Sequence, residues 1–355
     1  MLLRCSHIRR GMTLVELMVV VAIIGLLAVA VLPALSSTAE IRRGREAVRM
    51  VTSFIAKSQS RAIGRREWSG FQVVPSGSAS FAAVDLVLAD VPPVYRGDTV
   101  PAVVTVAGSG TTRQASWTGG VLQSGSSIGV RAGDLIRFGD EAHWFELAAT
   151  PAASASGSVT FLFRGRDAGH EPGNTPWPPS GVPAIPLSFE ILRQPTTSGS
   201  PISLPAGRAI DLFWSGFGPA TAALYGRFDV TSSGTTPTAG ATTSVLFDAA
   251  GRLRQIVVQN ATATTTRRVT ATGPVFLLIG RPDRVGQPYS PNAGGNDDTV
   301  GANWQYPDSF WIAIDLSTGA VTSAECKPNA VGANDTEKLL DSQEWIRQAS
   351  LAGGR

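Results

Sequence analysis

The most apolar stretch of the chain lies close to its N-terminus. From Leu17 to Leu35 no residue carries a charged side chain. A helix of that length extends about 28 Å, close to the ~30 Å hydrocarbon core of a bilayer. Arg9 and Arg10 precede the stretch, and basic residues flanking a membrane helix stay on the cytoplasmic side. The pattern predicts a membrane-spanning helix with a cytoplasmic N-terminus, and everything after about residue 40 across the membrane.

The helical pattern continues past the apolar stretch. Residues 38–67 contain no proline, and their apolar positions recur near helical spacing: Val48, Val51, Ile55, Ala62 and Ile63. The other positions are strongly basic, with eight Arg or Lys against three Glu. This basic face is either a solvated helix surface or a contact for acidic subunits or lipid headgroups. Gly44 and Gly64 each weaken a helix by roughly 1 kcal/mol and are candidate bends.

From residue 70 onward, short β-rich runs alternate with turn residues. Phe310–Leu316, followed by Ser317-Thr318-Gly319 and residues 320–322, predicts a hairpin, and residues 247–253 predict another around Gly251. Segments rich in Gly, Ser, Thr and Ala predict loops at 107–128, 151–158, 196–203, 232–244 and 288–303. Further predicted strands cover 71–74, 82–88, 102–106, 134–138, 144–148, 158–163, 185–192, 209–214, 226–230, 244–248, 252–259 and 275–279. Residues 335–349 predict a C-terminal helix.

The charge balance argues against a nucleic-acid partner. The formal net charge is +3, and residues 1–11 carry all of it in Arg4, Arg9 and Arg10. The rest of the chain holds equal numbers of basic and acidic side chains, 27 of each. The pI near 9.1 therefore reflects a short N-terminal piece rather than a basic binding surface. Two cysteines exclude a disulfide-stapled fold, and with three histidines they leave little material for zinc.

One acid, Glu16, stands at the beginning of the apolar stretch. A carboxylate inside a bilayer costs roughly 2.5–3.5 kcal/mol on insertion scales, so Glu16 is a functional candidate unless it lies at the solvated interface. The stretch is also longer than the 7–15 apolar residues of a secretory signal peptide, which has no use for a buried acid.

Residues Gly11 to Gly25, GMTLVELMVVVAIIG, closely resemble the class III signal of type IV pilins and type II secretion pseudopilins. The resemblance implies that a prepilin peptidase cuts between Gly11 and Met12 and N-methylates Met12. Glu16 is then fifth from the cut, where the family carries its glutamate, and Pro33 is twenty-second, where many members have a helix-bending proline. Met12 departs from the family, in which phenylalanine is commonest here.

The residue types suit this chemistry. Gly11 has no side chain, which lets the scissile backbone enter a tight protease site. Cleavage exposes an amine on Met12, and Glu16 can pair with that amine on a neighbouring subunit. Such a pair offsets the burial cost of the acid only when the partner is present. Pro33 either bends the helix or is a tolerated kink.

A second resemblance concerns the end of the helix and the late hairpin. Residues 56–67 resemble the helix end of GspH/FimT-like minor pseudopilins, and residues 315–321, DLSTGAV, resemble the end of that domain. The implied fold class is α+β and pilin-like, with a long N-terminal helix packed on an antiparallel β-sheet domain and long loop insertions.

The expected organisation has five parts. They are a leader (1–11), a transmembrane helix (12–36), an extramembrane continuation of that helix (37–67), a β-rich pseudopilin globular domain (68–328) and a C-terminal helix or tail (329–355). The expected location is the inner membrane, with a single span, a cytoplasmic N-terminus and a periplasmic globular domain.

The expected function is that of a structural subunit of a pilus or pseudopilus, as a minor pseudopilin of a type II secretion system. Its partners would be other pilin or pseudopilin subunits, the prepilin peptidase and N-methyltransferase, the inner membrane and the secretion assembly platform. One alternative is a minor type IV pilin acting in adhesion or DNA uptake. Another is a membrane-anchored enzyme or solute-binding domain whose N-terminus mimics the signal.

No enzyme signature is present in the sequence. His143 and His170 lack a His or Cys partner at metal-ligand spacing, and neither a nucleophile elbow nor a phosphate loop occurs. We therefore expect no catalytic residue and no cofactor. Asn296, Asp297 and Asp298 form an oxygen-rich segment that could hold calcium, although a plain solvated turn is favoured. Cys326, the lone cysteine after leader removal, is expected to be buried and inert.

Overall fold

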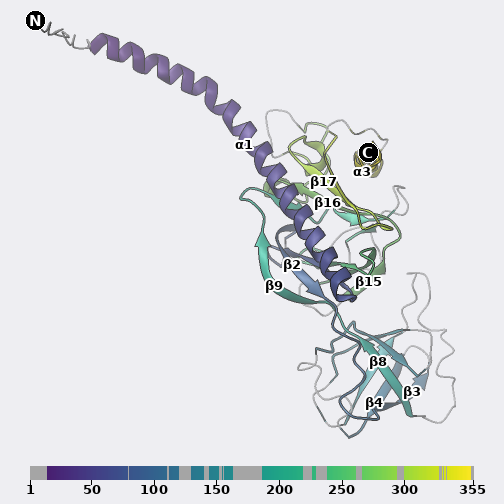
Figure 1. Cartoon of the computed structure of the whole chain (residues 1–355). Coiled ribbons are helices and arrows are strands. Elements are labelled where there is room, and N and C mark those ends of the chain that lie inside the picture. Colours follow the sequence, from purple (N-terminus) through teal and green to yellow (C-terminus); the bar gives the residue numbers. More distant parts are fainter. Residues whose placement is uncertain are drawn as a thin grey trace, which may run out of the picture.

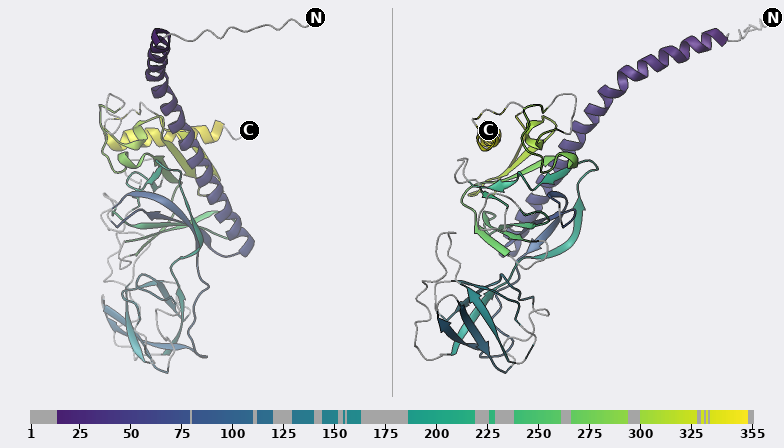
Figure 2. Two further views of the ribbon diagram at one scale, coloured as in Figure 1. Left: turned by 90° about the vertical axis from the view of Figure 1, so that its left-hand side faces the viewer. Right: turned by 180° about the vertical axis from the view of Figure 1, so that it is seen from behind.

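The computed structural model describes most of the chain. The described residues are 14–78, 80–109, 112–119, 129–139, 144–151, 154, 156–162, 186–218, 226–228, 238–260, 266–293, 300–327, 330, 332 and 334–352. Within them, the side chains of residues 27–39, 108, 109, 112, 226, 336 and 349–352 are not described. The predicted helix is confirmed as one element, α1 (Leu14–Arg65, 52 residues), which continues through Pro33. It leaves the β-rich body as a free, curved arm (Figures 1 and 2).

The transmembrane half predicted for this helix is not confirmed. Among the residues that the structure describes, no helix reaches the combined length and hydropathy of a membrane-crossing segment. The span over residues 12–36 therefore stays a prediction.

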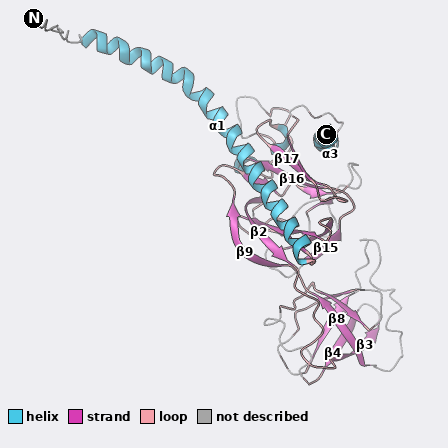
Figure 3. Cartoon of the chain, in the orientation of Figure 1, coloured by secondary structure: helices cyan, strands magenta, loops and turns pink. Residues whose placement is uncertain are grey.

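The rest of the described chain is mainly strand, as Figure 3 shows, with short 3₁₀ turns and a C-terminal helix. The strands are β1 (Ser69–Pro75), β2 (Ala82–Asp90), β3 (Val103–Ser109), β4 (Thr112–Trp117), β5 (Leu135–Phe138), β6 (Phe145–Leu147), β7 (Gly157–Leu162), β8 (Pro186–Leu192), β9 (Thr196–Ser203), β10 (Ala209–Asp211), β11 (Gly216–Phe217), β12 (Gly226–Arg227), β13 (Thr242–Phe247), β14 (Leu253–Gln259), β15 (Thr266–Thr270), β16 (Val275–Gly280), β17 (Phe310–Ile314) and β18 (Val321–Glu325). The 3₁₀ turns are η2 (Pro282–Arg284) and η3 (Asn303–Gln305), and the C-terminal helix is α3 (Asp335–Ala352).

Twelve strands form one antiparallel sheet, and α1 lies along one of its faces (Figure 1). The backbone path of the sheet runs β12-β11-β16-β10-β2-β1-β13-β14-β15, with β17, β18 and β9 paired beside it. Side chains alternate between the two faces of a strand, so alternate residues of the strands that lie against α1, such as Phe71 and Val73 of β1, share a core with the helix. The expected α+β arrangement of an N-terminal helix packed on an antiparallel sheet is confirmed.

The central strands β16 and β17 are buried on both faces, which explains their continuous apolar sequences. Val275, Leu277 and Ile279 face the core shared with α1. Phe276 and Leu278 point the other way, into a second core that includes Leu339 and Ile346 of α3. The sheet is thus the middle of three layers, and α3 lies near the end of the body where α1 leaves it (Figure 2).

The region predicted as one β-rich domain, residues 68–328, contains two sets of strands. Strands β3-β4-β7-β6-β5-β8 close into a separate six-stranded antiparallel barrel. The barrel has its own core, in which the rings of Phe138, Phe145 and Phe161 lie 4.9–5.8 Å apart. It is inserted between β2 and β9 and lies at the end of the body opposite the free arm of α1 (Figures 1 and 2).

Two predicted loops contain strands instead. Within 107–128, β4 pairs with β3 and β7 and turns Arg113, Ala115 and Trp117 inward. The segment 196–203 is strand β9, which pairs with β2 in antiparallel register. Because β9 is exposed on both faces, it has no apolar alternation to distinguish it from a loop.

The two hairpins and the C-terminal helix are confirmed. Strand β17 pairs with β18, and the Asp315 carboxylate accepts hydrogen bonds from the backbone and side chains of Ser317 and Thr318 in the turn. Strand β13 pairs with β14 around Gly251, whose φ of 78° suits a glycine. Helix α3 runs slightly past its predicted end, to Ala352.

Candidate assembly helix and its anchor on the sheet

The first described segment of α1, residues 14–26, is exposed at every position. Its large apolar side chains are between 40% and 74% exposed. Single exposed leucines or valines are ordinary on a protein surface, but here they form a continuous apolar segment. Exposed apolar surface on this scale marks a site of interaction with protein or lipid. We call residues 14–26 the apolar arm.

Glu16 lies in the first turn of this arm, and it too is exposed. An acid in the first turn of a helix interacts favourably with the partial positive charge of the helix N-terminus. That position suits either a structural role in the helix or a role in contact with another chain. Gly11 and Met12, the predicted cleavage pair, lie outside the described residues.

The second half of α1 is part of the core of the body. Ala47, Val51 and Ile55 are fully buried, at about one-turn spacing, and meet the alternating apolar side chains of β1, β13, β16 and β17. The basic residues predicted on the helix do not share one role: Arg42, Arg43, Arg49 and Lys57 are exposed, while Arg61 turns toward the body.

Gly44 marks the place where α1 first meets the sheet. A Cβ at this position would lie 2.5 Å from the ring of Phe310 and 3.3 Å from the Asp308 carbonyl oxygen. The glycine therefore permits a close helix–sheet contact, and its role is packing against the sheet. Gly64 differs, since a Cβ there would meet nothing within 4 Å.

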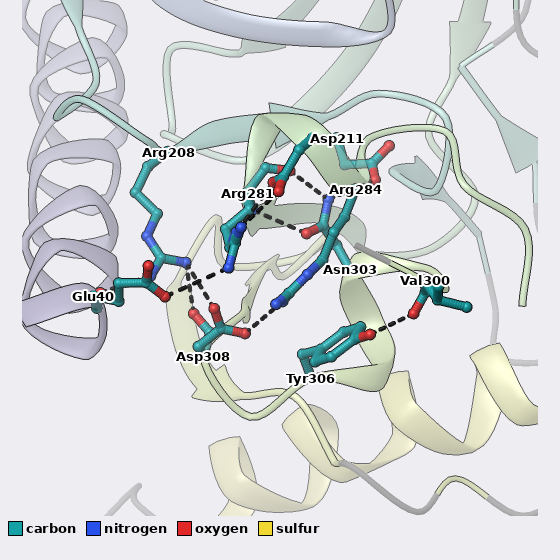
Figure 4. A network of polar contacts seen from close by, with 10 residues as sticks. Glu40, Arg208, Asp211, Arg281, Arg284, Val300, Asn303, Tyr306 and Asp308 are labelled. Carbon is teal, nitrogen blue, oxygen red and sulfur yellow. Dashed lines mark hydrogen bonds and ion pairs between the residues drawn. The ribbon is translucent and has the colours of Figure 1, made fainter. Parts of the chain in front are cut away.

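A buried polar network fixes the helix at the same point (Figure 4). Arg208 donates one hydrogen bond to the Glu40 carbonyl oxygen of α1 at 2.6 Å and one to the Asp308 carbonyl oxygen at 2.8 Å. Its side chain is only 1% exposed, and burial lowers the pKa of its guanidinium. An arginine in such a site is held by its hydrogen bonds and by nearby carboxylates, and removing either is costly.

Two more arginines complete this network. The Arg284 guanidinium lies 2.9 Å from the Asp308 carboxylate and stacks over the Tyr306 ring at 3.5 Å from its centroid. Arg281 lies 3.7 Å from the Glu40 carboxylate and 2.6 Å from Asp283. Tyr306 in turn donates a short hydrogen bond to the Val300 carbonyl. The side chains thus connect α1 with β10, η2 and the segment after η3.

Next to this network, Asn303 connects the end of β10 with the residue that follows β16. Its amide donates to the Asp211 carboxylate at 3.0 Å, and its side-chain oxygen accepts from the Arg281 backbone at 2.9 Å. Complete burial raises the pKa of Asp211 to about 6, although the hydrogen bonds from Asn303 and the backbone act in the opposite direction. Gly280 leaves room for this contact, because a Cβ there would lie 2.2 Å from Asn303.

A second anchor holds the other end of α1. Arg61 makes a two-pronged hydrogen bond to the Asp90 carboxylate, at 2.6 and 2.9 Å, and Arg65 adds a contact at 3.2 Å. Desolvation acts to raise the pKa of Asp90, but hydrogen bonds from Arg61, Ser69 and Ser198 outweigh it and lower the pKa to about 2. Asp90 ends β2, where the chain leaves for the barrel, and its carbonyl accepts from Thr196 where the chain returns.

Together these contacts hold α1 on the body at two points, which we call the clamps: the first is Arg208 with Glu40 and Asp308, and the second is Arg61 with Asp90. The apolar arm projects beyond the first clamp. The sequence predicts the helix, which the structure confirms, but it does not predict the clamps. Arg208, Asp308 and Asp90 carry no local signal, because their partners lie far away in the chain.

The other predicted site residues bring no chemistry together. Asn296, Asp297 and Asp298, like His143 and His170, lie outside the described residues. Within the described part of the chain, no three His, Cys, Asp or Glu side chains gather as metal ligands. Cys326 is buried as predicted, and desolvation raises the pKa of its thiol, which disfavours the reactive thiolate.

Comparison with known proteins identifies the N-terminus. Residues 7–32 match the model of the prokaryotic N-terminal methylation motif, so the chain carries a prepilin-type signal of the kind found in type IV pilins and pseudopilins. No curated protein matches the chain. One solved structure, the phage phi92 endosialidase, aligns at 11% identity with a TM-score of 0.16, over 75% of this chain and 39% of its own length. That TM-score is too low to bear on the fold.

The two helix glycines give a matched test of the first clamp. Gly44→Ala should lower the free energy of unfolding by about 1–3 kcal/mol, because the new methyl group meets the buried Phe310 ring. Gly64→Ala should instead raise it by about 0.5–1 kcal/mol, because the alanine fits and favours the helix. Denaturant unfolding of the full chain in detergent measures both, and equal effects at the two positions would contradict the close contact.

The second clamp predicts a defined pH dependence. Because the folded pKa of Asp90 lies below its unfolded value, the ionised acid stabilises the fold above about pH 4, and this stability is lost as the pH falls toward 2. Asp90→Asn should cost about 1 kcal/mol at pH 7, since solvent screens part of the interaction, and should flatten the unfolding free energy between pH 4 and 2. Glu67→Gln, at an exposed acid just past the helix, is the control. An unchanged slope in Asp90→Asn would exclude this anchor.

Proposed function

We propose that this protein is a structural subunit of a pilus or pseudopilus, specifically a minor pseudopilin of a type II secretion system. Prepilin peptidase cuts it between Gly11 and Met12 and methylates Met12. The helix over residues 12–36 then anchors it in the inner membrane, with the β-rich body in the periplasm. The observation that carries the proposal is the N-terminal methylation motif over residues 7–32, which overlaps a helix whose residues 14–26 are mostly apolar and exposed at every position.

Glu16 supplies the register between subunits in this proposal. When the apolar arm enters a bundle of like helices, the carboxylate loses its water, and an ionic partner must replace it. The new amine of Met12 on a neighbouring subunit supplies that partner. Apolar packing gives adhesion that is non-directional, whereas one charge pair in an apolar bundle selects a single axial offset.

The clamps explain how the body would follow its helix during assembly. Lifting a subunit out of a membrane puts a pulling force on the junction between the apolar arm and the sheet. Gly44, Phe310 and the Arg208 network lie at this junction. Packing alone resists separation but not sliding. The hydrogen bonds from Arg208 and the Arg61–Asp90 pair fix the helix along its axis as well.

A second candidate is a minor type IV pilin acting in adhesion or DNA uptake. The inserted barrel favours it, because this body has its own core and lies at the end of the molecule farthest from the apolar arm (Figure 1). In a filament held together by the arms, that end would face away from the helix bundle and would be free to meet a ligand.

The assembly role of Glu16 is tested with Glu16→Val in cells that make the filament. We expect normal leader removal and membrane insertion, because valine is more compatible with lipid than glutamate is. Incorporation into filaments should fall at least tenfold, since the registering pair is lost and a loss of about 1.4 kcal/mol already gives a factor of ten.

Glu46→Val is the matched control, because it removes an exposed acid from the same helix beyond the apolar arm. It should leave incorporation near the wild-type level. Sheared filaments and the membrane fraction, both quantified by immunoblot, give the two readouts. Wild-type incorporation of Glu16→Val would refute the role assigned to this acid.

A further inference from the structure

The charges of the chain are divided unequally between α1 and the body. Residues 40–67 hold eight basic and three acidic side chains, whereas residues 68–355 hold 19 basic and 23 acidic ones. Three of the basic side chains of α1 form ion pairs with the body: Arg61 and Arg65 with Asp90, and Arg45 with Glu325. The remainder lies on the solvent side of the helix.

Two arginines form what we call the basic collar: Arg42 and Arg43. Both are exposed, and neither forms an ion pair with any residue that the structure describes. Arg42 lies on the side of α1 turned away from the sheet and Arg43 at the edge of that side, since Gly44, Ala47 and Val48 face the body. Of the neighbouring acids, Glu40 pairs with Arg281 of the body and Glu46 is exposed, so the collar keeps a net positive charge.

The collar lies at a defined distance from the apolar stretch. Arg42 follows Leu35, the last residue of that stretch, by seven positions, which is about 10 Å along a helix. The headgroup layer on each side of a bilayer is about 5–8 Å thick. Arg42 and Arg43 would therefore begin just outside the layer, and their long side chains can reach back into it.

We propose that the basic collar binds the anionic phospholipid headgroups of the outer leaflet before the subunit is assembled. This inference rests on the proposed function, because it requires the preceding helix to span the membrane. Guanidinium groups suit the ligand, since they form paired hydrogen bonds with phosphate oxygens and remain charged at any physiological pH. Attraction to an anionic surface also fades within a Debye length, which restricts the effect to the first residues past the bilayer.

The collar would have a consequence for the timing of assembly. While the leader is attached, Arg4, Arg9 and Arg10 hold the cytoplasmic end of the helix. After cleavage those charges are gone, and the collar holds the opposite end at the outer surface. The processed subunit is then fixed at the depth from which it enters the filament.

Lipid selection by the full-length processed chain tests the inference. The protein is reconstituted in vesicles containing equal amounts of phosphatidylcholine and phosphatidylglycerol, extracted gently, and the lipids it retains are measured by mass spectrometry. We expect an excess of phosphatidylglycerol that falls by on the order of tenfold in Arg42→Gln/Arg43→Gln and falls with added salt in the wild type.

A second double variant, Lys57→Gln/Arg66→Gln, is the matched control. It removes the same charge from exposed positions of α1 and its end, with Lys57 about 22 Å beyond Arg42, and should keep the phosphatidylglycerol excess. Equal losses in both variants, or no excess in the wild type, would overturn the inference. The inference would also be overturned if Arg42→Gln/Arg43→Gln kept its lipid selection but entered filaments less well. That result would show that the collar binds an acidic neighbouring subunit instead of lipid. If the wild-type protein did not insert into the vesicles and retained neither lipid, that result would instead contradict the membrane anchor of the proposed function.

Discussion

One helix must satisfy two different apolar environments, and the rest of the structure depends on how it does so. From Gly44 to Ala62, α1 is covered by the sheet, whereas residues 14–26 have no cover within the described part of the molecule. Exposed apolar surface of this extent is unfavourable in water and must be buried by lipid or by other chains. The body therefore has to grip the helix firmly at one end while leaving the other end free for that second environment.

The grip combines packing with directional contacts. Phe310 against Gly44 and the buried side chains from Ala47 onward provide apolar area, which resists separation but permits sliding. Arg208 bonded to the Glu40 carbonyl, and Arg61 bonded to Asp90, fix the axial position. Asp90 also ties the end of α1 to the strands that lead to and from the barrel: its carboxylate accepts hydrogen bonds from Arg61 and Ser69, and its backbone carbonyl accepts one from Thr196.

Local patterns predicted the helix, the hairpins at Ser317-Thr318-Gly319 and Gly251, and most strands, because each of these depends on residues close together in the chain. The barrel could not be predicted in this way. Its closure pairs β3 with β8, whose residues Val103 and Ser188 lie far apart in sequence, while its strands look like any others. The clamps could not be predicted for the same reason, because Glu40, Arg208 and Asp308 are far apart in sequence and meet only in the folded chain. Gly44, predicted as a possible bend, has a packing role that only its contact with Phe310 reveals.

The central claim is that the chain matures into an anchored helix with a newly exposed N-terminus, and its intact mass tests this most directly. The protein should be isolated from the membranes of cells with and without a prepilin peptidase. We expect a chain that begins at methylated Met12 when the peptidase is present, retains residues 1–11 when it is absent, and needs detergent in both cases. A chain that begins at Met1 in both strains, and that dissolves without detergent, would contradict it.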